Sequence, residues 1–419
     1  MRGFGLLLLC WPLMTLAANN ALTLPEALAS ADAPHPDLSI AESDLAISLA
    51  DRDQADSRQD FNLFLDGAAR TGRQPDGDWR ADNIGRIVAR KPLLDFGRTA
   101  QAVAAADYEI AARRAALVDV RSARRIDLMA RFFDVLLTDL QYAADNEFMT
   151  VAFLQWDNAR DRFSLGQITQ PQLIELEARF QDLRERRATS ALLQRTSRQK
   201  LANAMNRPDT LPSGLIEPAL PGNEQKVPEY EKMLAQVLER NPALLSLNAQ
   251  INAGDARIAA ARSENRPTLD AEVLGATYSR GLSTRDQISA GLLFNVPLYQ
   301  GGRIDARVSR ERALRDRLLA QRDKFKLNLT QTVLDTLQEI EWLRGSARPA
   351  AEKQIEYRDW ALERSRAEYE LEMKTNLGTS MAETQNALIR RKRVEYQLAL
   401  ALARLAALSG ELPTVQESK

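Results

Sequence analysis

A long stretch without helix-breaking residues constrains the fold of this chain more than any other feature of the sequence. Between Gly97 and Gly166 lie 68 consecutive residues, none of which is glycine or proline, the two residue types least compatible with a helix interior. A single helix of that length would extend about 100 Å, at 1.5 Å per residue. Because a compact globular domain does not need such a helix, we expect an elongated molecule.

Apolar residues form two neighbouring stripes along the middle of this predicted helix. Two stripes imply a neighbouring helix on each side, as in a wall of helices, whereas a two-stranded coiled coil needs only one stripe. After Gly166 the apolar spacing predicts a returning helix that packs antiparallel on the first and ends near Asn206. The stripes consist of Met129, Phe133, Leu136 and Leu140 and of Leu128, Phe132 and Val135, and the returning helix carries Leu173, Leu176, Phe180 and Leu183.

The segment that precedes the long helix occurs twice in the chain. Pro92 and Gly97 are followed 205 positions later by Pro297 and Gly302, with a leucine after each proline and an arginine after each glycine. Proline ends a strand because it lacks a backbone donor, and glycine permits the tight reversal that starts a helix. We therefore predict a strand-to-helix joint in each copy and an internal duplication.

Alternating residues precede both joints and predict two strands in each copy. Before the second joint, every other residue from Ile288 to Val296 is apolar, the pattern of a strand with one apolar face. Each predicted strand has about 10 residues, the length that a tilted strand needs to cross a bilayer. Two soluble hairpins that pack one face on a core would give the same pattern. If the strands are membrane strands, several chains must close one barrel, because hydrocarbon does not tolerate unpaired sheet edges.

The repeat defines the boundaries that we predict. Residues 1–18 have the pattern of a signal peptide, with Arg2 before an apolar core and small residues before Asn19. The first structural repeat then spans 19–206 and the second 229–410, with a proline-rich linker in the equatorial region at 207–228 and a flexible tail at 411–419. Gly345 and Pro349 predict a kink or break in the second long helix. The predicted elements are strands at about 59–70, 79–91, 268–279 and 286–298, long helices at 98–163 and 303–371, and return helices at 170–205 and 378–409.

Composition and charge argue against several classes of function. The formal net charge of −1 gives no overall attraction to nucleic acid. Cys10 lies in the predicted signal, so the mature chain would have no cysteine for a disulfide, a thiol nucleophile or a metal site. The single histidine, His35, lies in a predicted turn. Since no catalytic or metal-ligand constellation stands out from the helical charge pattern, we expect no enzyme activity, no cofactor and no metal.

The order and spacing of several motifs resemble the TolC-like outer membrane efflux protein family over about residues 22–412. The resemblance implies an α+β, mostly α fold with an internal duplication. It implies a homotrimer, in which four strands from each chain form a shared twelve-stranded transmembrane β-barrel and long antiparallel helical hairpins form a trimeric α-barrel. The motifs are the duplicated joint, Leu22 to Leu28, Arg162 to Gly166, Asn241 to Leu244, and Leu408 to Gly410.

The family resemblance also implies a function and partners. The chain would be the passive exit duct of a tripartite efflux pump or type I secretion system in the outer membrane of a Gram-negative bacterium. Its partners would be a periplasmic adaptor (membrane fusion) protein, an inner-membrane transporter of the RND, ABC or MFS class, and outer membrane lipid, with no nucleic acid. The alternative is a soluble periplasmic coiled-coil scaffold, although a scaffold gives no reason for an apolar outward strand face.

The resemblance places a periplasmic gate at the two turns between antiparallel helices. We expect opening to depend on contacts around Arg162, Thr169, Tyr369 and Lys374. The candidate gate residues are Arg162, Phe163, Gly166, Thr169, Tyr369, Glu372, Lys374 and Glu383, and the joint residues are Pro92, Gly97, Pro297 and Gly302.

This chain departs from the family pattern at the expected pore constriction. Gln172, Gly378 and Met381 stand where aspartates often ring the pore. Glu372 or Glu383 would then supply the negative collar, since symmetry-related carboxylates near one axis attract permeating cations. The alternative is that both glutamates are solvated charges on a helix face.

Overall fold

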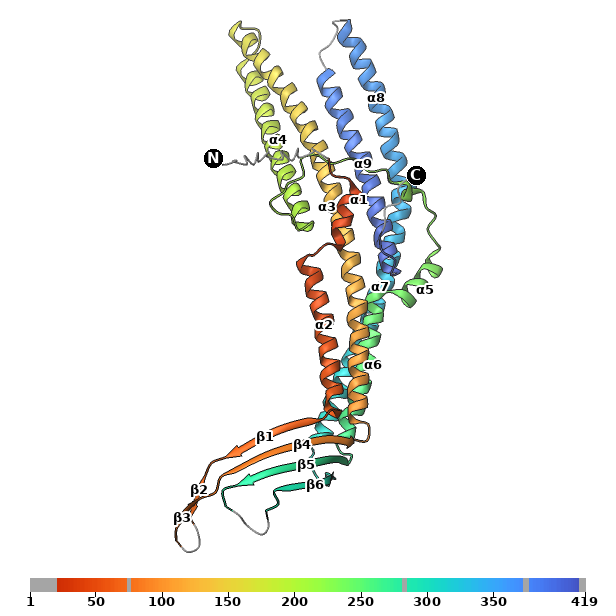
Figure 1. Cartoon of the computed structure of the whole chain (residues 1–419). Helices are drawn as coiled ribbons and strands as arrows, with labels where there is room; N and C mark the ends of the chain where they lie inside the picture. Colours follow the sequence, from red (N-terminus) through yellow and green to blue (C-terminus); the bar gives the residue numbers. More distant parts are fainter. Residues whose placement is uncertain (1–20, 74–76, 281–284, 372–376, 414–419) are drawn as a thin grey trace, which may run out of the picture.

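The chain is an elongated array of long helices with a small β-sheet at one end (Figure 1). The computed structural model describes residues 21–73, 77–280, 285–371 and 377–413. The predicted signal with Cys10, and the candidate gate residues Glu372 and Lys374, lie outside the described residues. The helices are α1 Leu24–Ala29, α2 Pro36–Asp56, α3 Arg98–Ser164, α4 Gln170–Ala204, α5 Tyr230–Arg240, α6 Pro242–Ser263, α7 Arg303–Trp342, α8 Arg348–Glu370 and α9 Leu377–Leu408, with short turns η1 Ser30–Asp32, η2 Ser57–Gln59, η3 Pro221–Glu224 and η4 Leu343–Ala347.

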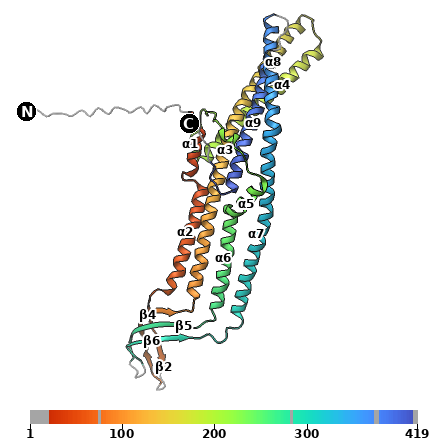
Figure 2. The ribbon, with the colours of Figure 1, turned by 90° about the vertical axis from the view of Figure 1, so that its right-hand side faces the viewer.

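The helices form a wall that is organised around α3. In the half nearer the sheet the order across the wall is α2, α3, α6 and α7, and in the other half it is α4, α3, α9 and α8 (Figures 1 and 2). The shorter helices stack end to end. Asn206 Nδ2 donates to the Pro34 carbonyl at 2.9 Å where α4 meets α2, and Asn241 Nδ2 donates to the Leu408 carbonyl at 3.1 Å where α9 meets α6.

Most residues of the two apolar stripes of α3 are buried, and Leu136 and Leu140 are partly buried. Leu128, Met129, Phe132 and Phe133 are each at most 3% exposed. They share one core with α1, with the end of α4 and with Tyr396 of α9. The two stripes therefore contact neighbours on two sides, which is the arrangement expected for a wall of helices. A second core joins α5, α6, α7 and α9 around Val237, Leu244, Val333 and Leu398.

The second long helix is divided, whereas α3 is continuous. Residues Leu343–Ala347 form a π-helical turn between α7 and α8, and the Arg348 N–H donates to the Leu343 carbonyl five residues back. Pro349 lacks an N–H and its ring would clash with the Gly345 carbonyl in a regular α-helix. One wider turn removes this conflict. The kink or break predicted from Gly345 and Pro349 is therefore confirmed, and the long helix predicted at 303–371 is divided there into α7 and α8, joined by a π turn.

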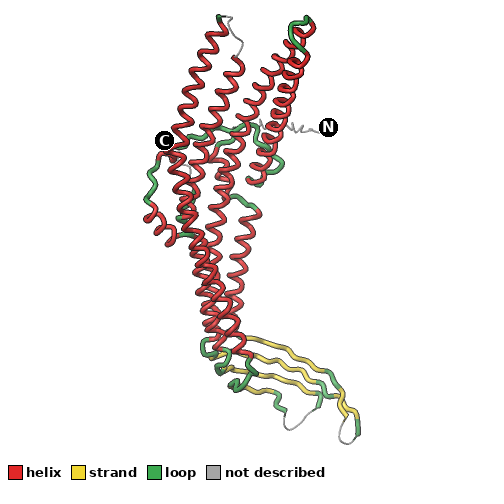
Figure 3. The backbone as a smooth tube through the Cα atoms, turned by 180° about the vertical axis from the view of Figure 1, so that it is seen from behind, coloured by secondary structure: helices red, strands yellow, loops and turns green. Residues whose placement is uncertain are grey.

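The sheet contains four antiparallel strands in the order β1, β4, β5 and β6, and β2 and β3 form a separate ribbon beyond it (Figure 3). The strand predicted at 79–91 is wrong as one element, because the chain leaves the ladder at Asp82 and Asn83. The Asp82 N–H donates to the Arg70 carbonyl at 2.8 Å, and the Asn83 N–H donates to Ser279 Oγ at 2.7 Å. The strands are β1 Asn62–Ala68, β2 Thr71–Arg73, β3 Trp79–Ala81, β4 Ile84–Leu94, β5 Thr268–Tyr278 and β6 Ile288–Asn295.

Pro92 does not end its strand, contrary to the prediction. It pairs with Asp270 inside β4, and the register shifts between Pro92 and Leu94. On the other side of β4 the pairing with β1 stops at Arg90. Because one edge of β4 is free at this position, a residue without a backbone donor is tolerated there.

Candidate functional site: sheet, joints and helical tips

One face of the sheet is apolar across all four strands. Leu65, Ile87, Gly275 and Ile288 lie opposite one another in a single row, and Leu63, Ala89, Val273 and Ala290 form the next. Leu65 is 80% exposed and Ile288 79% exposed, so no part of the described chain covers this face. An exposed apolar face of this extent marks a surface for lipid or for another protein.

The opposite face of the sheet carries charged residues on either side of one apolar row, Phe64, Val88 and Leu274. Arg90 on β4 pairs with Glu272 on β5 at 2.5 Å, and Arg86 on β4 lies 3.9 Å from Asp66 on β1. Within the described residues β1 and β6 are each paired along one side only. The sheet therefore has one apolar face, an opposite face that carries the ion pairs, and an open edge on each side.

Asp95 fixes the first strand-to-helix joint. Its carboxylate accepts hydrogen bonds from the Gly97 N–H at 3.0 Å and from the Thr99 N–H at 2.7 Å, which satisfies free donors at the start of α3. Burial raises the pKa of Asp95, but the hydrogen bonds from Thr99 and Gly97 outweigh that effect and leave the pKa below its usual value. Gly97 has a φ of 89°, in the left-handed region that glycine tolerates best.

The second joint has the same backbone form without a carboxylate. Gly302, with a φ of 74°, precedes α7, and the Arg303 N–H donates to the Gln300 carbonyl at 3.2 Å. Pro297 lies two residues beyond the last residue of β6, Asn295. The left-handed geometry shared by Gly97 and Gly302 thus accounts for the repeated motif. Asp95 also stabilises the first joint, but the repeat did not reveal it, because Gln300 stands at the matching position of the second joint.

The first helical tip brings four candidate gate residues together. After α3 the Gln167 N–H donates to the Arg162 carbonyl and the Gly166 N–H to the Phe163 carbonyl, both at 2.9 Å. Gly166 has a φ of 68°, as is common where a helix ends. The Thr169 N–H then donates to Gln172 Oε1 at 2.9 Å. Gln172 therefore has a local role in starting α4.

The second helical tip places Tyr369 in the last turn of α8, where it is 54% exposed. Glu383 lies lower, in the second turn of α9, and forms an ion pair with Arg358 of α8. Ser365 and Ser380 share a hydrogen bond of 2.6 Å across the same pair of helices. The Glu383 carboxylate is thus partly neutralised and links α8 to α9.

Gly378 is a contact between the two hairpins. A Cβ atom built on Gly378 would lie 2.5 Å from Val151 Cγ2 of α3, so only glycine allows α9 to approach α3 this closely. The family resemblance places Gly378 where aspartates often ring the pore, and the structure gives it a packing role.

Residues 214–225, here called the strap, connect the two halves across the middle of the wall. Ile216 N–H donates to the Leu22 carbonyl at 2.9 Å, and Glu217 of the strap pairs with Lys392 of α9. The Tyr396 hydroxyl donates to Glu217 Oε1 at 3.4 Å while its ring stacks on Phe133 of α3 at 4.5 Å. Burial, with the nearby Glu217 charge, raises the pKa of Tyr396, so its hydroxyl stays protonated.

The strap also contacts the π turn directly. Arg344, within the turn, donates to the Asn223 carbonyl at 2.7 Å. Arg348, the next helical residue, donates to Glu224 Oε1 at 2.7 Å and to Glu395 Oε1 of α9 at 2.7 Å. The interruption of the second long helix is therefore held by charged hydrogen bonds from two directions.

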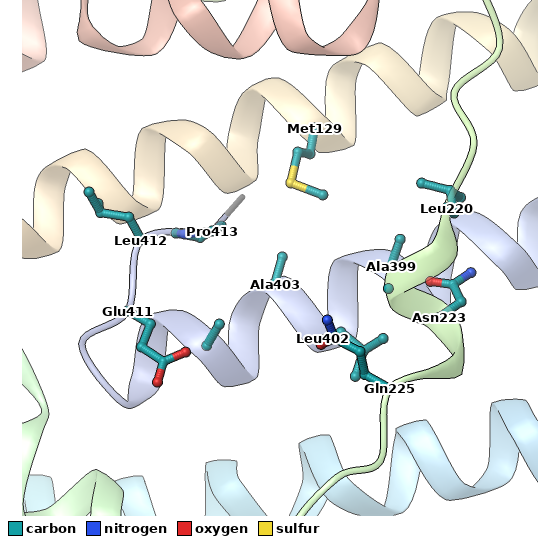
Figure 4. Close-up of a pocket in the computed structure, with 12 residues that line it drawn as sticks. Met129, Leu220, Asn223, Gln225, Ala399, Leu402, Ala403, Glu411, Leu412 and Pro413 are labelled. Carbon is teal, nitrogen blue, oxygen red and sulfur yellow. The ribbon is translucent and has the colours of Figure 1, made fainter. Parts of the chain in front are cut away.

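A pocket lies beside the strap, between α3, α9 and the chain that follows α9 (Figure 4). Met129, Leu220 and Leu402 give it an apolar wall, and Glu411 is the one titratable side chain among its 12 lining residues. Across the described part of the chain, no three His, Cys, Asp or Glu side chains are grouped so that they can hold a metal ion. The pocket lining therefore offers no acid-base pair.

Among the described residues, none of the helices combines the length and the apolar character needed to cross a membrane.

These features together define an elongated wall of helices that ends in a small sheet with one exposed apolar face. Residues 233–411 match the family model described as outer membrane efflux protein. A search of curated proteins gives no match. The match covers 179 of the 419 residues of the chain, from α5 to the end of α9, and this part of the chain is similar to the outer membrane efflux protein family.

Solved structures with similar folds cover nearly the whole chain. CusC matches with a TM-score of 0.74 and 17% identity, covering 93% of this chain and 92% of that one. The Campylobacter jejuni CmeC outer membrane channel matches with a TM-score of 0.76 and 14% identity, covering 94% and 87%. The open state of the Neisseria gonorrhoeae MtrE outer membrane channel matches with a TM-score of 0.73 and 17% identity, covering 94% and 91%. At these identities the comparison shows a common fold.

Proposed function

We propose that this chain is the passive exit duct of an efflux pump, located in the outer membrane of a Gram-negative bacterium with its helices in the periplasm. The observation that carries the proposal is the sheet. Its apolar face is exposed on all four strands and its other face carries the interstrand ion pairs, as expected when lipid lies on one side and water on the other. The match to the outer membrane efflux protein family supports the same function.

The two open sheet edges support a shared barrel. Four strands cannot close on themselves around a pore, and unpaired edges are not stable in hydrocarbon. A homotrimer with a twelve-stranded barrel satisfies both edges of every copy. The helical wall would then continue the barrel as a periplasmic tunnel. The matching order of elements in residues 19–206 and 229–410, with paired stacks of short helices beside each long helix, supports an origin by internal duplication.

The helical tips form the periplasmic entrance in this proposal. A periplasmic adaptor protein and an inner-membrane transporter of the RND, ABC or MFS class would engage this end, and a type I secretion system would use the same geometry. Arg162, Phe163, Gly166 and Thr169 lie together on the first tip and Tyr369 lies on the second. Because Glu383 is paired with Arg358, a negative collar at this level would require that ion pair to separate.

Matched substitutions on the two faces of β6 test the proposal. Leu292 lies on the apolar face, and Ser289 lies on the opposite face. An arginine on the lipid face costs about 2–4 kcal/mol at the bilayer centre, whereas one on the aqueous face costs little. We expect Leu292→Arg to abolish heat-modifiable assembly and recovery in the outer membrane fraction, and Ser289→Arg to retain both. Recovery of the unsubstituted protein in the soluble periplasm would instead favour the coiled-coil scaffold.

A further inference from the structure

We propose that a pocket in the half of the wall nearer the sheet is a transit site for amphiphilic organic anions, molecules that carry one carboxylate or sulfonate group on an apolar body. The pocket has a volume of about 350 Å³, which lies within the range of small-molecule sites. The inference rests on the proposed duct, because it names a class of cargo that the duct would carry.

The pocket lies on the concave side of the wall. It is lined by residues of α2, α3, α6 and α7, although α2 and α7 are the two edges of this half of the wall and α3 and α6 lie between them. Both edge helices can line one pocket only on the side towards which the wall bends. If copies close into a ring, as the proposed duct requires, the concave side faces the axis and the pocket opens to the lumen.

The pocket adjoins both strand-to-helix joints. Arg98 directly follows Gly97 at the start of α3, and Arg307 lies in the second turn of α7. Arg58 lines the pocket from η2, just before β1. In the proposed duct this is the level at which the helical tunnel meets the barrel, so cargo that leaves the tunnel passes the pocket.

Arginines outnumber carboxylates in and around the pocket. Glu109 is shared by Arg113 and Arg257, at 3.4 Å and 2.9 Å, and two further glutamates of the lining each have an arginine partner. The lining and these partners together carry a formal excess of two positive charges, which favours a negatively charged ligand. The arginines are Arg58, Arg98, Arg113, Arg257, Arg307 and Arg310, and the acidic residues are Asp51, Glu109, Glu264 and Glu311.

Arg98 supplies a fixed donor that no protein group uses. Its Nη2 donates to the Glu264 carbonyl at 3.0 Å, which holds the guanidinium in place. Its Nε is buried and has no hydrogen-bond partner within the described chain. A buried donor without a partner costs free energy, and an anion in the pocket would satisfy it with a charge-assisted hydrogen bond. Arg58 forms no ion pair with any described residue and would add a second positive charge.

Small apolar side chains make up much of the rest of the lining. Alanines present a shallow surface without polar atoms, so they accommodate an apolar ring system while the arginines hold its acidic group. Weak binding of this kind suits a duct, because cargo must bind well enough to enter and loosely enough to leave. The alanines, all buried or partly buried, are Ala55, Ala102, Ala105, Ala106, Ala260 and Ala261.

Naphthalene probes of similar shape and different charge test the site. The probes are naphthoate, neutral naphthylmethanol and naphthylmethylammonium, and their binding to the full chain in lipid nanodiscs is measured by titration calorimetry, with empty nanodiscs as the blank. We expect naphthoate to bind about tenfold more tightly than either other probe, since a hydrogen bond to a charged group has an effect of this size.

Matched substitutions locate the binding. Arg98→Gln removes the charge beside the pocket and should weaken naphthoate binding about tenfold. Arg262→Gln is the control, because Arg262 is exposed on α6 next to Ala261 and lies outside the pocket lining, and it should leave binding unchanged. Asp51→Asn removes a negative charge from the lining and should tighten naphthoate binding about twofold. Since a misfolded chain would not bind more tightly, this variant separates charge from folding.

Equal affinity for the three probes, no binding of naphthoate, or equal losses with Arg98→Gln and Arg262→Gln would overturn the proposed site. Export of a neutral drug by cells that carry the unsubstituted chain is measured in parallel. Normal export without a preference for the anion would refute the site and leave the duct standing. A preference for the anion in a chain that never supports export would refute the duct and leave the pocket as an anion site without a role in transit.

Discussion

The two helical hairpins at the periplasmic end have similar outlines and different construction. The first continues α3 without interruption and is filled by aromatic packing, with Trp156 stacked on Phe180 at a centroid distance of 5.3 Å. The second is separated from α7 by the π turn and is joined by polar contacts, including Arg358–Glu383 and Ser365–Ser380.

This difference indicates that the first hairpin is a fixed part of the wall and that the second hairpin is an adjustable part. Aromatic packing in the first hairpin is lost only with a large free-energy cost. Half-exposed ion pairs and hydroxyl contacts in the second hairpin contribute little each and exchange readily with water. We therefore expect the second hairpin to move on the π turn while the first stays in place, and the strap to restrain that motion.

The largest expected effect comes from removing an aromatic side chain in the first hairpin. Phe180→Ala leaves a cavity beside Trp156 and Phe153 and should reduce the free energy of unfolding by about 3 kcal/mol. Trp360 of the second hairpin is 73% exposed, so Trp360→Ala should change the free energy of unfolding by less than about 0.5 kcal/mol. Denaturant unfolding of the purified proteins measures both. Similar losses would mean that the hairpins do not differ in this way.

The next effect concerns the close approach of the two hairpins. Gly378→Val adds a side chain whose Cβ would lie 2.5 Å from Val151 Cγ2, and should reduce the free energy of unfolding by about 1–3 kcal/mol through overpacking. Gly345→Ala, in the π turn, meets no atom within 4 Å and should be neutral or slightly stabilising. Thermal unfolding compares the two, and equal tolerance at both positions would show that α9 does not depend on this contact with α3.

A smaller effect separates the two joints. Asp95→Ala removes two hydrogen bonds to the start of α3 and should reduce the free energy of unfolding by about 1 kcal/mol, whereas Gln300→Ala should reduce it by only about a few tenths of a kcal/mol. Because the pKa of Asp95 is lowered in the folded chain, its contribution is present above the unfolded pKa of about 3.9 and is lost as pH falls through the folded value. The stabilities of Asp95→Ala and the unsubstituted protein should therefore converge in acid. A constant difference at all pH values would contradict the role of the carboxylate.

The smallest effect concerns the strap. Arg348→Ala removes contacts to Glu224 and Glu395 and should lower local stability by no more than about 1 kcal/mol. Amide hydrogen exchange should become faster across Leu343–Ala347 and α8, while α3 at the same level stays unchanged. Arg364→Ala is the control, because its ion pair with Glu368 lies within α8. Unchanged exchange in the π turn would show that the strap does not restrain it.

The sequence predicts the long-range plan of this fold better than its local contacts. The absence of glycine and proline predicts a helix that the structure has as Arg98–Ser164, and the paired apolar stripes predict its two buried sides. The chain also has the mostly helical fold with a small sheet that the family resemblance implied. These features are periodic, so a run of residues carries the signal many times over.

Single contacts are less predictable because they depend on partners far away in the chain. Pro92 looked like a strand end, yet the free edge of β4 accommodates it. No pattern in the sequence indicates that Glu383 is paired, because its partner Arg358 lies on α8 and reaches it only when α8 packs on α9. Asp95 gave no signal, because its role arises only after the left-handed turn at Gly97 brings two N–H groups to its carboxylate.

A reconstruction by electron microscopy of the full chain, extracted from outer membranes, tests the account most directly. We expect a ring of copies in which the apolar sheet faces point outward around a hollow axis and the helical walls continue that axis as a tunnel. A folded particle whose sheets face inward, or whose helices pack without a water-filled axis, would contradict the account.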